Sequence, residues 1–195
     1  MQVLLDIRQV TGTGIRRFRE FAPALPLRAH VACYWTNHGS TTPPQSTAPN
    51  LILPDGCTDI IFQLHPQTAD AVVIGPMWRS RSVVASSALA LGIRFYPGAA
   101  PTFLGEMLAG LQERVIPLAA FCGSAADRLL DRLLGTASLV AQLHVLEHWL
   151  CGQLRRRTLS DPHVLRALLS TYTQRGRLTA RELARNVHTH PTMSE

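Results

Sequence analysis

The feature that most constrains this fold is a change in the spacing of apolar residues close to Pro97. Before it, short segments are rich in β-branched and aromatic residues or alternate between apolar and small or polar residues, as β-strands do. These segments are residues 31–37, 59–64, 71–74 and 89–95. After it, apolar residues recur about every 3.6 positions, the period of a helix. The sequence therefore predicts an α+β fold with an N-terminal β-barrel or sandwich followed by helices.

Local signals mark where the helices begin and end. Ser124 and Asp127 predict a capping box, and Gly135 stands where a C-cap belongs. The pair at 161–162 is Asp-Pro, which starts another helix because proline suits the first helical turn. Between them, one apolar stripe is formed by Leu139, Leu143, Leu146 and Leu150. We expect a long amphipathic helix there.

The chain is predicted to have three parts, namely a β-rich domain over residues 1–98, a helical connector over 99–160 and a small helical module over 161–195. Charge is unevenly distributed among them. Residues 1–150 hold eleven arginines against ten acids, whereas residues 151–195 hold eight against three. A basic end on a near-neutral body is typical of a nucleic-acid-binding module, although a solvated arginine-rich helix gives the same pattern.

Composition indicates a globular protein rather than a membrane or secreted one. Hydrophobic residues make up 46% of the chain. No window approaches the roughly eighteen uncharged apolar residues of a membrane span, and the first residues lack a signal-peptide pattern, so we expect a cytoplasmic location. The cysteines are widely spaced and form no CxxC pair; they are Cys33, Cys57, Cys122 and Cys151. We expect reduced thiols without a zinc site or a disulfide framework.

One pattern suggests an enzyme. His144, Glu147 and His148 match the H-x-x-E-H string of a zinc peptidase, but both histidines lie off the leucine stripe and are expected to face solvent. A small barrel also suggests the alternative of a cupin-like metal enzyme, which needs histidines and a carboxylate that converge on a metal from neighbouring strands. The β region offers His30, His38 and His65, with no His-x-His pair. We expect no catalysis, no metal and no cofactor.

A small-ligand pocket is predicted inside the β-rich domain. Its residues combine apolar walls with a polar anchor: Tyr34, Trp35, Phe62, Arg94 and Phe95. Arg94 alternates onto the face opposite Phe95, so a surface arginine is the competing interpretation. Asp55, in a Pro-Asp-Gly turn, and Asp59 are predicted to act structurally rather than as a catalytic pair.

The C-terminal end carries helix-turn-helix signals. Thr179 and Glu182 form a T-x-x-E capping box, and Leu183 and Ala184 supply an apolar and a small packing position. A turn is expected at residues 188–189, with Pro191 opening the next helix.

Five segments together resemble an AraC-type transcription regulator with an uncharacterised, barrel-like N-terminal domain. They are VACYW at 31–35, LPDGCTDIIF at 53–62, GP at 75–76, GIRFYPG at 92–98 and GRLTARELA at 176–184. They follow the family's order over nearly the whole chain.

The resemblance implies a DNA-binding transcription regulator that senses a small molecule. Its partners would be promoter DNA, an unknown effector and a second copy of the chain in a homodimer. The expected DNA-contacting residues are Arg181, Arg185, His190 and Thr192, and the chain would end within the first helix-turn-helix. The alternatives are a free-standing small-ligand-binding β-barrel domain and a metal-dependent cupin-like enzyme.

Overall fold

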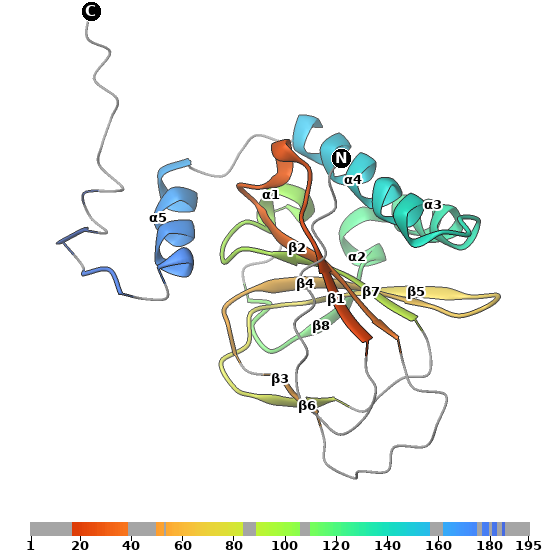
Figure 1. Ribbon diagram of the computed structural model, residues 1–195, viewed down its shortest axis with the longest axis horizontal. Coiled ribbons are helices and arrows are strands. Elements are labelled where there is room, and N and C mark those ends of the chain that lie inside the picture. Colours follow the sequence, from red (N-terminus) through yellow and green to blue (C-terminus); the bar gives the residue numbers. More distant parts are fainter. Residues whose placement is uncertain are drawn as a thin grey trace, which may run out of the picture.

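The structure is a computed structural model that describes residues 17–38, 50–52, 54–83, 89–105, 110–156, 162–174, 177–179, 181, 182 and 185. Figure 1 shows a layer of strands with helices above it and a small two-stranded sheet below it. The described part thus has the predicted α+β class, with an N-terminal sheet domain followed by helices. No helix within these residues is long and apolar enough to span a membrane.

The main layer is a six-stranded antiparallel sheet in the order β1-β2-β7-β4-β5-β8. Its strands are β1 (Arg17–Phe21), β2 (Val31–His38), β4 (Thr58–Leu64), β5 (Ala69–Ile74), β7 (Leu89–Phe95) and β8 (Val115–Pro117). A second sheet pairs β3 (Asn50–Ile52) with β6 (Arg81–Val83). All four segments predicted as strands are confirmed. The Ser-, Thr- and Pro-rich stretch over residues 40–50, whose composition predicts a loop, lies outside the described residues except for Asn50, which begins β3.

The described α-helices all come after β7 in the sequence, whereas the short helix η1 (Leu25–Leu27) lies between β1 and β2. The α-helices are α1 (Pro101–Leu104), α2 (Ala119–Cys122), α3 (Ser124–Leu134), α4 (Leu139–Arg156) and α5 (Pro162–Thr173). The prediction that only helices follow Pro97 is wrong at β8, which lies between α1 and α2 and pairs with β5. The division into three domains stays a prediction.

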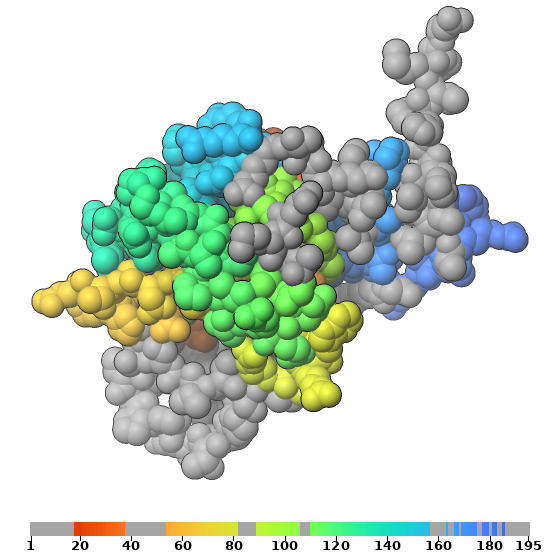
Figure 2. Space-filling view, turned by 180° about the vertical axis from the view of Figure 1, so that it is seen from behind, coloured from red at the N-terminus to blue at the C-terminus, as the bar shows by residue number. Residues whose placement is uncertain are grey.

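The hydrophobic core lies between the helices and one face of the main sheet, which we call the helix face. Alternate residues of β4 and β7 are buried there, including Ile60, Phe62 and Phe95. Phe103 of α1 and the leucines of α3 and α4 complete the cluster. The space-filling view shows α3 and α4 packed together above the projecting β4–β5 hairpin (Figure 2).

Helix α4 has the predicted stripe: Leu143, Leu146 and Leu150 are buried, and Leu139 is partly buried. Gln142 also lies in the core, where its Nε2 donates hydrogen bonds of 3.2 Å to the Leu133 and Thr136 carbonyls. This side chain joins α4 to the last turn of α3.

Two of the predicted helix ends are confirmed and one is wrong. Gly135 is the C-cap of α3, and Pro162 begins α5. The Ser124–Asp127 capping box does not form, because Gly123 is the N-cap and Ser124 is already helical. The Ser124 Oγ instead accepts a hydrogen bond from Arg128 Nη1 at 3.0 Å. Gly123 has φ 53°, a conformation that favours glycine, so the chain enters α3 from a turn with no side-chain cap.

Candidate functional site

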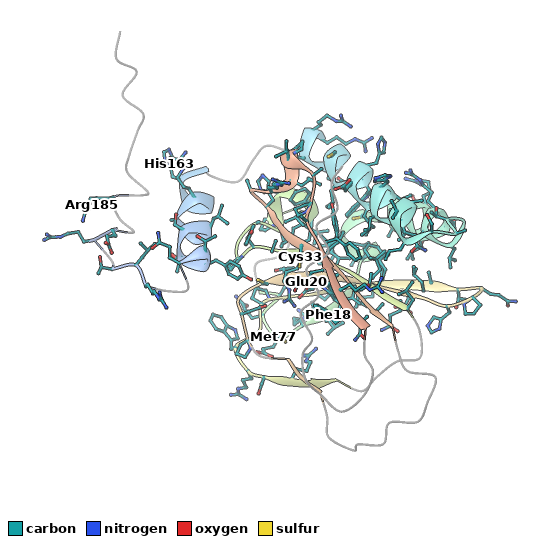
Figure 3. The ribbon with its side chains drawn as sticks, viewed as in Figure 1. Phe18, Glu20, Cys33, Met77, His163 and Arg185 are labelled. Carbon is teal, nitrogen blue, oxygen red and sulfur yellow. The ribbon has the colours of Figure 1, made fainter. Side chains whose placement is uncertain are left out.

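The face of the main sheet opposite the helices, which we call the distal face, carries polar and aromatic side chains. Strand alternation directs the odd-numbered residues of β4, and those of β2 from Cys33 onward, to this face. Strand pairing aligns Cys33, Arg94 and Asp59 across three neighbouring strands. Figure 3 shows Phe18 and Glu20 of β1 and Cys33 of β2 along these two strands. The distal face therefore gathers chemically active groups from strands that are distant in the sequence.

Arg94 is the centre of a charged cluster on this face. Its Nε and Nη2 donate hydrogen bonds of 3.1 Å to the two oxygens of Asp59, and its Nη1 lies 3.4 Å from Asp55 Oδ2. Trp35 Nε1 donates to Asp59 Oδ1 at 3.0 Å. We call Trp35, Asp55, Asp59 and Arg94 the Arg94 cluster. A bidentate arginine–carboxylate pair fixes geometry as well as charge, so the cluster ties β2, β7 and β4 together.

The indole of Trp35 lies flat across the neighbouring strand. A Cβ placed on Gly92 of β7 would collide with Cε2, Cζ2 and Nε1 of this ring, so the lack of a side chain at Gly92 makes room for it. The Phe18 ring stacks on Trp35 with centroids 5.9 Å apart. Trp35 is 9% exposed, and its ring therefore fills the surface over Gly92 while its Nε1 reaches Asp59.

The electrostatics of the cluster favour a permanent ion pair. Burial acts to lower the pKa of Arg94, but the charge of Asp59, its hydrogen bonds and the charge of Asp55 outweigh it and leave the pKa raised. Burial raises the pKa of Cys33 to about 12, with the charge of Glu20 adding to the effect. Cys33 thus stays a protonated thiol at neutral pH, and Arg94 is not free to hold an anion unless Asp59 or Asp55 moves away.

Asp55 makes the kind of turn contact expected of it. Its Oδ1 accepts a hydrogen bond from the Cys57 backbone N–H at 3.0 Å, the pattern by which aspartate stabilises a turn, while Gly56 has φ 71°. Asp59 is held between Arg94 and Trp35. Both carboxylates are therefore engaged in contacts that support the sheet and its turn.

The five predicted pocket residues do not share one face. Tyr34, Phe62 and Phe95 belong to the core on the helix face, whereas Trp35 and Arg94 belong to the Arg94 cluster. Tyr34 is 1% exposed, its pKa is raised by burial, and no described group hydrogen-bonds its hydroxyl. Arg94 is neither unpaired nor fully exposed, so the surface-arginine interpretation does not describe it either.

The H-x-x-E-H residues lie as the helical period predicts. His144 and His148 are exposed on α4, and Glu147 Oε1 accepts a hydrogen bond from the Ala24 backbone N–H at 2.8 Å. Glu147 therefore joins α4 to the segment before η1. Across the described ranges, no three His, Cys, Asp or Glu side chains form a group that could hold a metal ion.

The predicted capping box near the C-terminal end is confirmed. Glu182 Oε2 accepts hydrogen bonds from the Thr179 N–H at 2.8 Å and the Thr179 hydroxyl at 2.7 Å. The Glu182 N–H donates to Thr179 Oγ1 at 3.3 Å. Hydrogen bonds from Thr179 lower the pKa of Glu182. Arg181 and Arg185 are exposed, and Arg185 lies beyond α5, away from the sheet (Figure 3), whereas His190 and Thr192 lie outside the described residues.

No sequence pattern pointed to the residues around the cluster. Cys57, Tyr96 and Tyr172 meet beside it: the Tyr96 and Tyr172 ring centroids are 5.2 Å apart, and the Tyr172 hydroxyl lies beside the Cys57 thiol. Alternation along β4 could have placed Asp59 on the distal face, opposite Phe62. No local pattern could have brought Tyr172 to Cys57, because they are far apart in the sequence.

Fold and site together define a small α+β domain in which helices cover one face of an antiparallel sheet and a charged, aromatic cluster lies on the other. The chain belongs to the family described as a domain of unknown function (DUF6597), whose model matches residues 19–117. That range runs from within β1 to the end of β8, so it takes in nearly all of the main sheet. No curated protein and no solved structure matches the chain.

Proposed function

We propose that this chain is the sensing and dimerisation portion of an AraC-type transcription regulator. The resemblance of five segments in the family's order supports the assignment, and so does the concentration of arginine after residue 150. The proposal gives the chain no catalytic role. Its partners are promoter DNA, a small-molecule effector and a second copy of the chain.

The observation that carries the proposal is the reciprocal capping box of Thr179 and Glu182. A box of this kind satisfies backbone N–H groups at a helix start, so it fixes where a helix begins. Arg181 and Arg185 are four residues apart on that helix and are exposed, where they can approach phosphate oxygens. A capped, basic helix at this place suits the supporting helix of a helix-turn-helix.

For the sensing role, the proposal favours the distal face over the helix face. Tyr34, Phe62 and Phe95 are packed in the core, whereas Trp35 and Arg94 combine an aromatic surface with charge. An effector that bound there would contact the Arg94 cluster first. Its polar groups would compete with Asp55 or Asp59 for the guanidinium.

The test uses protein expressed from the complete reading frame. Duplexes selected from a random pool are titrated against scrambled duplexes at two salt concentrations. We expect discrimination that survives the higher salt, because base contacts specify sequence whereas phosphate contacts alone do not. Equal, salt-sensitive binding to both duplexes would overturn the proposal, and a small-molecule thermal-shift screen would then test the free-standing ligand-binding alternative.

A further inference from the structure

Helix α5 contacts the sheet domain through Tyr172. The Tyr172 ring packs edge-to-face on Tyr96, with centroids 5.2 Å apart and an interplanar angle of 71°. The Tyr172 hydroxyl also lies beside the Cys57 thiol. Burial is the main cause that raises the pKa of both groups, and the interaction between them adds to the rise at Tyr172 and opposes it at Cys57, as expected when a phenol faces sulfur. Tyr172 therefore uses its ring and its hydroxyl on two different segments.

Both contact points of Tyr172 are tied to the Arg94 cluster. The Cys57 N–H donates to Asp55 Oδ1 at 3.0 Å, and the other oxygen of Asp55 lies 3.4 Å from Arg94 Nη1. Tyr96 follows Arg94 by two residues, just after the end of β7. Cys57 is 3% exposed, so a shift of the Asp55 turn would move a buried partner of Tyr172. The cluster and α5 are thus linked by two short paths.

We propose that Tyr172 is a latch whose closed state depends on an intact Arg94 cluster. The cluster is broken when Asp55 or Arg94 is substituted, or when a ligand competes for either side chain. The turn at Cys57 and the end of β7 then shift, and α5 separates from the sheet. The consequence for DNA rests on the proposed function, because α5 is the helix that precedes the Thr179–Glu182 capping box. The latch itself does not depend on DNA binding and can be tested in the 195-residue chain. One ring pair and one polar contact between a hydroxyl and a thiol can separate while the domain stays folded.

The experiment measures amide hydrogen exchange of α5 peptides by mass spectrometry in the 195-residue chain. Tyr172→Phe removes the hydroxyl and keeps the ring, and Asp55→Asn weakens the cluster without touching α5. The matched control is Thr173→Ala, an exposed neighbour whose hydroxyl bonds to the Leu169 carbonyl of its own helix. We expect exchange of residues 162–174 to rise about fivefold or more in the first two variants and to change little in the control.

The double variant Asp55→Asn/Tyr172→Phe distinguishes a latch, in which both residues act on α5 through one contact, from two independent effects on α5. If Asp55 acts on α5 through Tyr172, Asp55→Asn adds little to α5 exchange in the Tyr172→Phe background. Unchanged α5 exchange in Tyr172→Phe, or fully additive increases in the double variant, would overturn the latch. Peptides from α4 report on global unfolding, and an equal rise there in Tyr172→Phe would also count against it.

Promoter binding by the complete protein is measured separately on the same variants. The wild type should discriminate between the duplexes. If Tyr172→Phe changes this discrimination several-fold and Thr173→Ala does not, the latch is supported as a regulatory device. If no variant discriminates between the duplexes, the proposed function is contradicted. The hydrogen-exchange result then tests the latch by itself. Normal discrimination with unchanged α5 exchange would contradict the latch and leave the proposed function standing.

Discussion

At the scale of single residues, the contact between Trp35 and Gly92 is the most demanding one on the distal face. The indole occupies the space in which any other residue at position 92 would place its Cβ. It is held there by stacking with Phe18 and by its bond to Asp59. The ring cannot retreat without losing both, because Asp59 is fixed by Arg94.

Gly92→Ala should therefore displace Trp35 and destabilise the domain by about 1–3 kcal/mol, the usual cost of overpacking. Gly152→Ala is the matched control, since a Cβ at Gly152 of α4 meets nothing within 4 Å. Alanine there should be neutral or should stabilise the helix by up to about 1 kcal/mol. Urea unfolding of both variants checks the difference, and a Gly92→Ala midpoint equal to that of the wild type would contradict it.

The Cys57 thiol should make stability fall at alkaline pH. Burial and the charge of Asp55 raise its pKa from 9.0 to about 12, while Arg94 and Tyr172 act in the opposite direction. The folded chain holds this proton to higher pH than the unfolded chain, so the stability it contributes is complete below pH 9.0 and is lost as pH rises toward 12.

Urea unfolding from about pH 8 to about pH 11 measures this loss. Cys57→Ala should lose less stability than the wild type over that range, and part of the loss should remain because the pKa of Cys33 is also raised to about 12. Peptide-resolved alkylation at neutral pH gives a second readout, since the thiolate is the reactive form. Alkylation of Cys57 as fast in the folded chain as in denaturant would refute the prediction.

At the scale of elements, periodicity located the strands and helices that have a buried stripe. Residues 58–64 alternate between buried and half-buried positions because β4 packs one face on the helices, and that alternation is visible in the sequence. Strand β8 was missed because it has only three residues, includes Pro117 and gains its pairing from β5. The register between paired strands likewise cannot be predicted from a local sequence pattern. The predicted pocket therefore combined residues from two faces of the sheet.

The join between α3 and α4 depends on one polar side chain in an apolar contact. Gln142→Met keeps the shape of the side chain but removes the donor to the Leu133 and Thr136 carbonyls. The Leu133 carbonyl keeps the Thr136 N–H as a donor at 3.2 Å, so the loss falls mainly on the Thr136 carbonyl. We expect the free energy of unfolding to decrease by about 1 kcal/mol. Gln153→Met, at a half-buried position of the same helix, should cost less than about 0.5 kcal/mol. Equal losses in the two variants would show that the bonds of Gln142 contribute nothing.

At the scale of the whole molecule, the sheet domain and the excess of positive charge lie in different parts of the sequence. The part matched by the family model ends at residue 117, whereas the arginine excess lies after residue 150. Composition predicted this separation, because net charge can be counted along the chain. It could not predict how α5 contacts the sheet, since the Tyr172 contacts depend on the tertiary positions of Cys57 and Tyr96.

The position of charge, rather than its total, should determine how the 195-residue chain binds duplex DNA. Arg181→Ala/Arg185→Ala and Arg128→Ala/Arg132→Ala each remove two exposed arginines four residues apart, so both variants lie two charges below the wild-type +6. Each lost phosphate contact lowers the magnitude of the salt dependence of log Kd by about 0.9. We expect a decrease of about 1.8 for the C-terminal pair and little change for the α3 pair. Titrations at several salt concentrations measure both slopes, and equal decreases in the two variants would mean that DNA responds to net charge alone rather than to a basic C-terminal segment.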